Sequence, residues 1–165
     1  MIFIIILLII AAYYFYPESK LPKGKEIDRI EVFKSKRRMK VYSEGVLLKT
    51  YRISLGRSPI GHKQFEGDCK TPEGIYSIDG RNPNSTFHKN LGISYPNEKD
   101  LEKAKSLGKP AGGDIKIHGL RNGRSYISKF HRWRDWTAGC IAVTDVEIDE
   151  LYDAVKIGAE IQVYP

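Results

Sequence analysis

Cysteine is scarce in this 165-residue sequence, which contains only Cys69 and Cys140. Two cysteines are too few for the disulfide framework of a small secreted scaffold, although they leave room for one bridge. Neither lies in a CxxC pair or beside histidines at the spacing of a zinc site, so we expect no metal. Internal repeats and low-complexity tracts are also lacking, and the length suits one hydrophobic core.

Acidic residues are the minority among the charges. The chain has 27 lysines and arginines against 20 aspartates and glutamates, a formal net charge of +7. Such basicity suits a nucleic acid, an anionic membrane surface or an acidic polymer. No nucleic-acid-binding module is visible, and the basic residues are spread along the chain, so we expect no nucleic-acid partner.

Charged side chains are absent from residues 1–16, an apolar run that includes Tyr13, Tyr14 and Tyr16. Its length is just under the roughly 17–25 residues that cross a bilayer, and the tyrosines lie where an interfacial aromatic belt would fall. We predict a signal anchor or signal peptide over 1–16, and favour an anchor because no clean cleavage site is evident. The charge bias opposes export, because basic residues follow the run and none precedes it: Lys20, Lys23, Lys25 and Arg29.

One mainly β domain is predicted over 27–165, after a polar linker over 17–26. Residues 27–33 alternate apolar and polar side chains, which is typical of a strand. Short helices are predicted over 96–107, capped by Asn97, and after the capping box of Thr144 and Glu147. We expect a curled sheet or sandwich that carries these two helices. Further strands are predicted at 39–42, 46–55, 75–79, 115–117 and 161–164, with a turn at 81–84, an irregular or strand segment at 87–95, and an end to the second helical region at Gly158.

The stretch 115–144 carries the residues best suited to catalysis. Cys140 follows Gly139, and His118 lies 22 positions upstream, which provides a thiol nucleophile and an imidazole base. Gly139 allows a tight backbone turn that aims amide N–H groups at one point, as an oxyanion hole requires. His131, nine positions before the cysteine, is the alternative base. The competing interpretation of Cys140 is a small buried hydrophobic residue without chemistry.

Basic residues fill the segment 116–134, which has no acidic residue. Their charge is expected to lower the pKa of a nearby thiol and to bind carboxylates of a ligand. Arg132 and Arg134, nearest the Cys140 turn, are the preferred carboxylate ligands. His62, His88 and Cys69 are expected to have no catalytic role. The basic residues of the segment are Lys116, Arg121, Arg124, Lys129, Arg132 and Arg134.

Three sequence blocks occur in a fixed order: Ser54-x-Gly56, then Thr71-Pro72-x-Gly74-x-Tyr76, then Ile117-His118-Gly119 with Thr137-x-Gly139-Cys140-Ile141. Together they resemble the L,D-transpeptidase catalytic-domain family of bacterial cell-wall enzymes, over roughly 27–165. The resemblance implies a β-sandwich-like fold and no metal or organic cofactor. It assigns Cys140 as nucleophile and His118 as base, with a backbone carbonyl at Gly119 that orients the imidazole.

The resemblance also implies a reaction and a location. Cys140 would attack the amide after meso-diaminopimelate in a peptidoglycan stem peptide, at the outer face of the cytoplasmic membrane. The acyl group would then pass to a second stem peptide, to a lipoprotein or to water. The residues expected to contact the substrate are Arg132, Arg134, Trp136, Thr137 and Tyr95, of which Trp136 and Tyr95 are equally suited to the core.

Two positions depart from the common form of the family. Ala138 replaces a histidine before the Gly-Cys pair, and Ala142 replaces an asparagine or arginine two residues after the cysteine. The form Trp-Thr-x-Gly-Cys-Ile-Ala resembles a distinct branch, which includes an amidase that releases lipoprotein from peptidoglycan. Transferase and hydrolase therefore both remain open. A catalytically weak, membrane-tethered wall-binding module is a further alternative.

Overall fold

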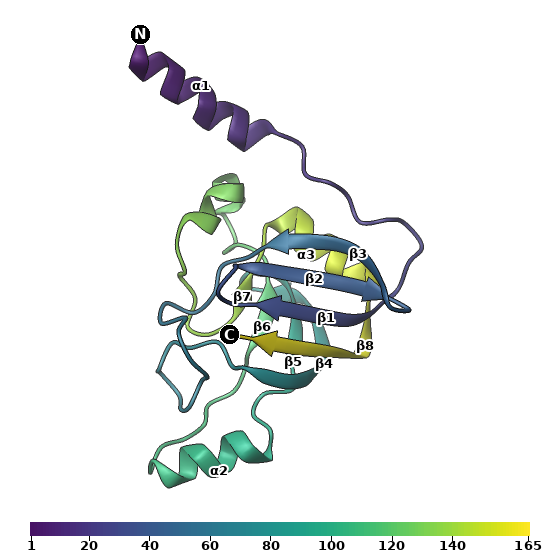
Figure 1. Ribbon diagram of the computed structural model, residues 1–165, viewed down its shortest axis with the longest axis vertical. Helices are drawn as coiled ribbons and strands as arrows, with labels where there is room; N and C mark the ends of the chain where they lie inside the picture. Colours follow the sequence, from purple (N-terminus) through teal and green to yellow (C-terminus); the bar gives the residue numbers. More distant parts are fainter.

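An eight-stranded sheet with the order β3-β2-β1-β8-β4-β5-β6-β7 is the centre of the computed structural model, which describes residues 1–165. Neighbouring strands are antiparallel except for β1–β8 and β6–β7, which are parallel. The sheet curls around the core (Figure 1), which confirms the predicted mainly β curled sheet. The strands are β1 (Ile27–Phe33), β2 (Arg38–Ser43), β3 (Val46–Arg52), β4 (Gly74–Ser85), β5 (His88–Ile93), β6 (Lys116–His118), β7 (Ile141–Ala142) and β8 (Val155–Tyr164).

The alternation of apolar residues determines which face of each strand is buried. In β1, Ile30 and Val32 are fully buried, and their partners in the parallel strand β8 are Ile161 and Val163. Side chains at alternate positions point to one face of a sheet, so these residues line the core side together. The core thus holds the two halves of the sheet in one curved body.

Two strands extend beyond the predicted boundaries. The polar segment 81–84, predicted as a turn, belongs to β4, where Arg81 and Asn82 pair with Leu91 and Asn90 of β5. Gly158 does not end the last helical region but lies inside β8 at φ +87°, where the pairing with β1 shifts register. In both places strand pairing overrides a local turn signal, with the adjacent strand β5 in the first case and with β1 in the second.

The two predicted helices are present as α2 (Glu98–Ser106) and α3 (Asp145–Ala154). Each begins with a complete capping box, with Asn97 and Thr144 as the N-cap residues. The expectation of only two helices is wrong. A 3-10 helix, η1 (Ser125–Trp133), follows β6, and an α-helix, α1 (Ile2–Phe15), precedes the sheet.

Residues 1–16, predicted as a membrane segment, form helix α1 and its C-cap, and α1 projects away from the sheet (Figure 1). Apolar side chains are exposed along its whole length. No helix of the structure, α1 included, combines the length and apolar character that crossing a membrane requires.

Candidate active site

The turn before β7 holds Cys140 in place through its own hydrogen bonds. The Thr137 hydroxyl donates to the Cys140 carbonyl at 2.7 Å and accepts the Gly139 N–H at 3.1 Å. Gly139 has φ +139°, and a Cβ at this position would lie 2.7 Å from the Lys70 carbonyl oxygen. Glycine is therefore required here, and the Thr137 side chain is committed to the turn while it also lines the adjacent cavity.

A second glycine brings two other segments against this turn. Gly56 forms a parallel bridge with Thr137, and its N–H donates to Thr71 Oγ1 at 3.1 Å. A Cβ on Gly56 would lie 2.2 Å from the Cys69 carbonyl oxygen and 3.1 Å from the Gly139 Cα. The Ser54-x-Gly56 and Thr71-Pro72 blocks thus act as the scaffold of the Cys140 turn.

His118 is the last residue of β6, and its imidazole is fixed by the next residue. Its Nδ1–H donates to the Gly119 carbonyl at 2.7 Å, so the neutral ring carries its lone pair on Nε2. A Cβ on Gly119 would lie 2.6 Å from Asp145 Oδ1 at the start of α3. Because β6 and β7 are adjacent and parallel, the chain segments that carry His118 and Cys140 lie side by side.

Burial favours the neutral forms of both Cys140 and His118. Burial raises the pKa of the Cys140 thiol and outweighs the hydrogen bond and charge of Lys116, which act in the other direction. Burial also lowers the pKa of His118, against the effect of its bond to Gly119. Neighbouring positive charge therefore acts in the expected direction, but burial outweighs it and the expected net lowering of the thiol pKa does not occur. The Cys140 thiol instead points to the Asp114 carbonyl at 3.6 Å.

Cys140 and His118 line one cavity of about 560 Å³. Its apolar wall includes Phe87, Phe130 and Trp136, and the Trp136 ring centroid lies 5.6 Å from that of His118. No carboxylate lines this cavity. Four arginines do, and none of them forms an ion pair: Arg57, Arg121, Arg124 and Arg134. A ligand with several carboxylates therefore fits the cavity electrostatically.

The predicted substrate-binding residues do not all meet here. Arg134, Trp136 and Thr137 line the cavity, whereas Arg132 and Tyr95 do not. Arg132 is 3% exposed at its side chain and is held by Glu18 and Glu147. Tyr95 packs in the core, where its hydroxyl donates to the Ala111 carbonyl at 3.2 Å.

Arg57 is the charged cavity residue that the sequence analysis did not identify. It follows the Ser54-x-Gly56 block, and its N–H donates to the Thr137 carbonyl at 3.0 Å. Its guanidinium lies 3.4 Å from Cys69 Sγ, which places the second thiol of the chain behind a cavity residue. The one sequence signal for Arg57 is that it directly follows the Ser54-x-Gly56 block. In the structure, Gly56 of that block pairs with Thr137 of the Cys140 turn.

The other histidines have different environments. His131 also lines the cavity, but burial, with the charge of Arg132, lowers its pKa to about 3, which makes it a poor base. Its Nδ1 accepts from Trp136 Nε1, and its Nε2 is buried without a protein partner. His62 and His88 lie outside the cavity, paired with Asp100 and Asp149. No cluster of His, Cys, Asp and Glu could hold a metal ion.

The curled sheet thus carries a cysteine and a histidine in one cationic cavity, and the Gly119 carbonyl orients the histidine. The family model of the L,D-transpeptidase catalytic domain (YkuD) matches residues 27–163. The chain belongs to the L,D-transpeptidase family. The match includes the Cys140 turn, the His118 strand and the Gly56 and Thr71 blocks, so the resemblance of the motifs extends to the whole domain.

Three relatives of this L,D-transpeptidase family member share between 16% and 28% sequence identity with it. YafK of Escherichia coli K12, which is assigned to this group by name, is 28% identical over 149 residues, or 82% of this chain and 53% of YafK. The chain thus spans about half the length of that relative. The structure of the helical cell shape determining protein Pgp2 from Campylobacter jejuni has a TM-score of 0.63 at 24% identity, and covers 92% of this chain and 52% of Pgp2. The L,D-transpeptidase LdtMt1 in complex with imipenem has a TM-score of 0.55 at 16% identity, with 86% and 60% covered.

Proposed function

We propose that this L,D-transpeptidase family member modifies peptidoglycan as a cysteine acyltransferase that acts on diaminopimelate-containing stem peptides through a thioester at Cys140. The observation that carries the proposal is the 2.7 Å hydrogen bond from His118 Nδ1 to the Gly119 carbonyl. This bond leaves Nε2 as the basic nitrogen, and His118 lines the same cavity as Cys140. An imidazole oriented in this way is the partner that a neutral thiol needs.

The chemistry begins from the neutral pair. His118 Nε2 takes the thiol proton as Cys140 Sγ attacks the carbonyl carbon of the scissile amide. The Cys140 N–H has no acceptor in the protein and is available to the oxyanion, whereas the Gly139 N–H is used by Thr137. When the C–N bond breaks, the imidazolium returns its proton to the leaving amine, and the acyl group remains on Cys140 as a thioester.

The cavity's charge supports a peptide substrate that carries several carboxylates. The four arginines of the cavity have no carboxylate partners in the protein, whereas Arg37 and Arg132 elsewhere are paired. Guanidinium groups bind carboxylates with two parallel hydrogen bonds. The free carboxylates of a stem peptide would therefore complete interactions that the fold leaves open.

The second step distinguishes a transferase from a hydrolase. An amine of a second stem peptide or of a lipoprotein would give transpeptidation, and water would give an amidase or carboxypeptidase outcome. Ala142 is fully buried in β7, so its departure from the common family form does not alter the cavity. Ala138 lines the cavity and is the departure that bears on the acceptor. A weak wall-binding module is the remaining alternative, and a reactive thiol separates it from the enzyme.

The family's substrate places the reaction in the bacterial cell envelope. We assign the domain to the outer face of the cytoplasmic membrane, with residues 1–16 as its signal anchor or signal peptide, on the basis of their uniformly apolar, charge-free sequence. The similarity to Pgp2, a helical cell shape determining protein, supports a role in cell-wall biogenesis and cell shape.

Purified peptidoglycan incubated with the full chain tests the proposal, with the muropeptides analysed by mass spectrometry. New crosslinks or lipoprotein attachments are expected for a transferase, and loss of existing links is expected for a hydrolase. Cys140→Ala is expected to produce neither change. If the wild-type protein has a reactive thiol but leaves the muropeptide composition unchanged, the proposal that it modifies the cell wall is contradicted.

A further inference from the structure

The 3-10 helix η1 forms one wall of the catalytic cavity. Ile127, Phe130 and His131 of η1 line that cavity, and Arg124 and Arg134 flank the helix on the same cavity. The helical backbone is interrupted inside η1 at Ser128, which has φ +43° and ψ −127°. A short helix with a kink has few stabilising bonds of its own, so the position of this wall depends on what packs behind it.

The segment behind η1 is the start of the chain, at residues 13–18. The Tyr14 hydroxyl donates to the Tyr126 carbonyl at 2.9 Å, and the Lys129 ammonium donates to the Tyr13 carbonyl at 3.2 Å and to the Tyr16 carbonyl. The ring of Phe130, a cavity residue, packs against Tyr14 at 5.3 Å between centroids and against Tyr13 at 6.0 Å. The two elements are more than 100 residues apart in sequence.

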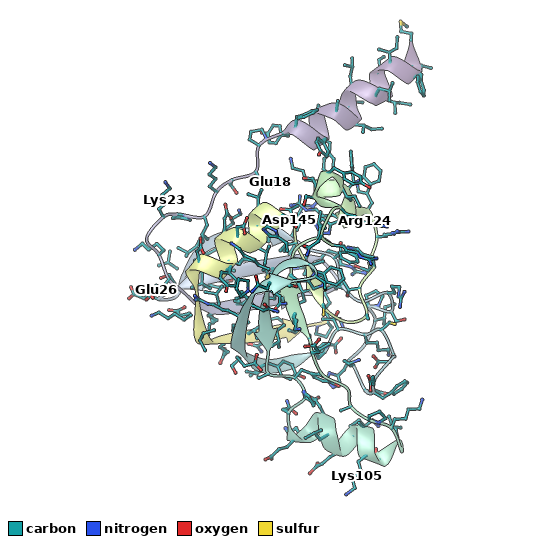
Figure 2. The ribbon with its side chains drawn as sticks, turned by 180° about the vertical axis from the view of Figure 1, so that it is seen from behind. Glu18, Lys23, Glu26, Lys105, Arg124 and Asp145 are labelled. Atoms are coloured by element: carbon teal, nitrogen blue, oxygen red, sulfur yellow. The ribbon has the colours of Figure 1, made fainter.

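An ion-pair network fixes the same segment to the body of the domain. Arg132 Nη1 donates to Glu18 Oε1 at 2.7 Å, and Arg132 Nη2 donates to Glu147 Oε1 at 2.8 Å. The Lys129 ammonium lies 3.7 Å from the Glu18 carboxylate. In the view of Figure 2, Glu18 is labelled on the side of the domain that faces α1, the side on which Arg124 and Asp145 are also labelled. Arg132 thus joins the N-terminal segment to η1 and to α3 at one buried point.

We propose that residues 13–18 are a brace that holds η1 in place as a wall of the catalytic cavity, with Glu18 as its positioning residue. Glu18 touches neither the cavity nor the reacting groups, and acts through Arg132 and Lys129. The predicted linker over 17–26 is accordingly docked at its start rather than free, and its Leu21 N–H donates to Glu150 at 3.3 Å. The effect on turnover rests on the proposed function, whereas the effect on η1 requires only that residues 13–18 stay attached to the domain, as in a signal anchor.

Hydrogen exchange of the full-length chain, in the absence of substrate, tests the brace directly. Glu18→Gln removes the carboxylate charge that Arg132 and Lys129 face, and is expected to speed exchange of the amides in 125–134 about tenfold because it weakens a charge-assisted hydrogen bond. Exchange in β1 and β8 is expected to stay unchanged. Glu18→Asp, which keeps the charge, is expected to recover most of the protection, and Tyr14→Phe to show a smaller effect in the same segment.

Glu26→Gln is the matched control, because it removes an exposed ion pair with Lys156 from the same N-terminal stretch, away from η1. It is expected to leave exchange in 125–134 unchanged.

With a purified stem-peptide substrate, Glu18→Gln is expected to raise KM more than it lowers kcat, because η1 lines the cavity without supplying the reacting groups. Exchange in 125–134 within twofold of wild type in both Glu18→Gln and Tyr14→Phe would overturn the brace. Exchange that rises equally across the whole sheet would also overturn it, since it would mark a general loss of stability.

Discussion

At the scale of single residues, Cys140 and His118 line one cavity, and burial favours the neutral form of each. Burial disfavours the thiolate and the imidazolium alike, which raises the pKa of Cys140 and lowers that of His118. In the proposed mechanism, the thiol therefore gives its proton to His118 during attack rather than before it. This arrangement differs from a thiolate–imidazolium pair formed in advance, and the difference is visible in the pH dependence of the thiol.

We predict that alkylation of Cys140 by iodoacetamide is slow at pH 7 and rises with a midpoint above the ordinary thiol value of about 8.5. The direction follows because burial shifts the thiolate to higher pH. Amide turnover is expected to extend to lower pH than an ordinary histidine allows, since His118 stays unprotonated. The rates are measured on a Cys69→Ser background, so that only Cys140 reacts. An alkylation midpoint below about pH 7.5 would show a thiolate formed in advance.

His131 provides a separate pH effect, on stability. Its pKa falls from the ordinary 6.5 to about 3 in the folded chain, so the unfolded state binds a proton between these values and the folded state does not. The contribution of His131 to the free energy of unfolding is therefore fully present above pH 6.5 and is lost as the pH drops toward 3. At pH 4 the free energy of unfolding is lower by about 3 kcal/mol because of this residue.

The test is urea unfolding of wild type and His131→Asn at pH 7.5 and pH 4. Asparagine retains a polar atom near the Trp136 and Ser54 contacts. The variant is expected to lose less stability on acidification than wild type, whatever its stability at pH 7.5. Equal losses in the two proteins would show that His131 is not buried in its neutral form.

The sequence singles out Cys140 and His118, which the fold brings to one cavity, because their signals are local: a glycine precedes Cys140 and another follows His118. It misassigned Arg132 because both partners of that side chain come from distant segments, Glu18 and Glu147. It missed Arg57 because only the folded chain brings the loop after β3 to the Cys140 turn.

At the scale of secondary-structure elements, helix caps were easier to predict than strand pairing. α2 and α3 were predictable because their capping boxes lie within four residues. The extension of β4 over 81–84 was not, since it depends on pairing with β5. Helix η1 was also missed: although Ile127, Phe130 and Trp133 recur at three-residue intervals, the segment is short and kinked, and its position depends on contacts with residues 13–18.

Gly56 lies at the junction where its own loop meets the loop of Cys69 and the Cys140 turn, so a side chain at this position is expected to disturb that turn. Gly56→Ala is expected to destabilise the chain by about 3 kcal/mol and to slow acylation of Cys140, because its methyl group would meet the Cys69 carbonyl backbone. Gly80→Ala is the control, since a Cβ there has no neighbour within 4 Å. Urea unfolding and imipenem acylation measure both effects. A Gly56→Ala protein as stable and as reactive as Gly80→Ala would contradict the role of this junction.

At the scale of the whole molecule, part of the excess positive charge of the chain, whose net charge is +7, lies around the cavity. Four arginines without acidic partners surround the cavity, so the positive potential is focused where a carboxylate-rich peptide would enter. We predict that Arg57→Gln combined with Arg134→Gln raises KM for a stem peptide by about tenfold, with a weaker dependence on salt. Arg52→Gln, which removes an exposed arginine outside the cavity, is expected to leave KM unchanged. Equal effects of the two changes would show that only the overall charge matters.

The central claim is that Cys140, with His118, is an acylating nucleophile. Intact-mass analysis after incubation with imipenem, the compound in the LdtMt1 structure, tests it most directly. Wild type and Cys69→Ser are expected to gain one adduct, Cys140→Ala none, and His118→Ala an adduct that forms about 10²–10⁴ times more slowly. An adduct on folded Cys140→Ala, or none on folded wild type, would contradict the account.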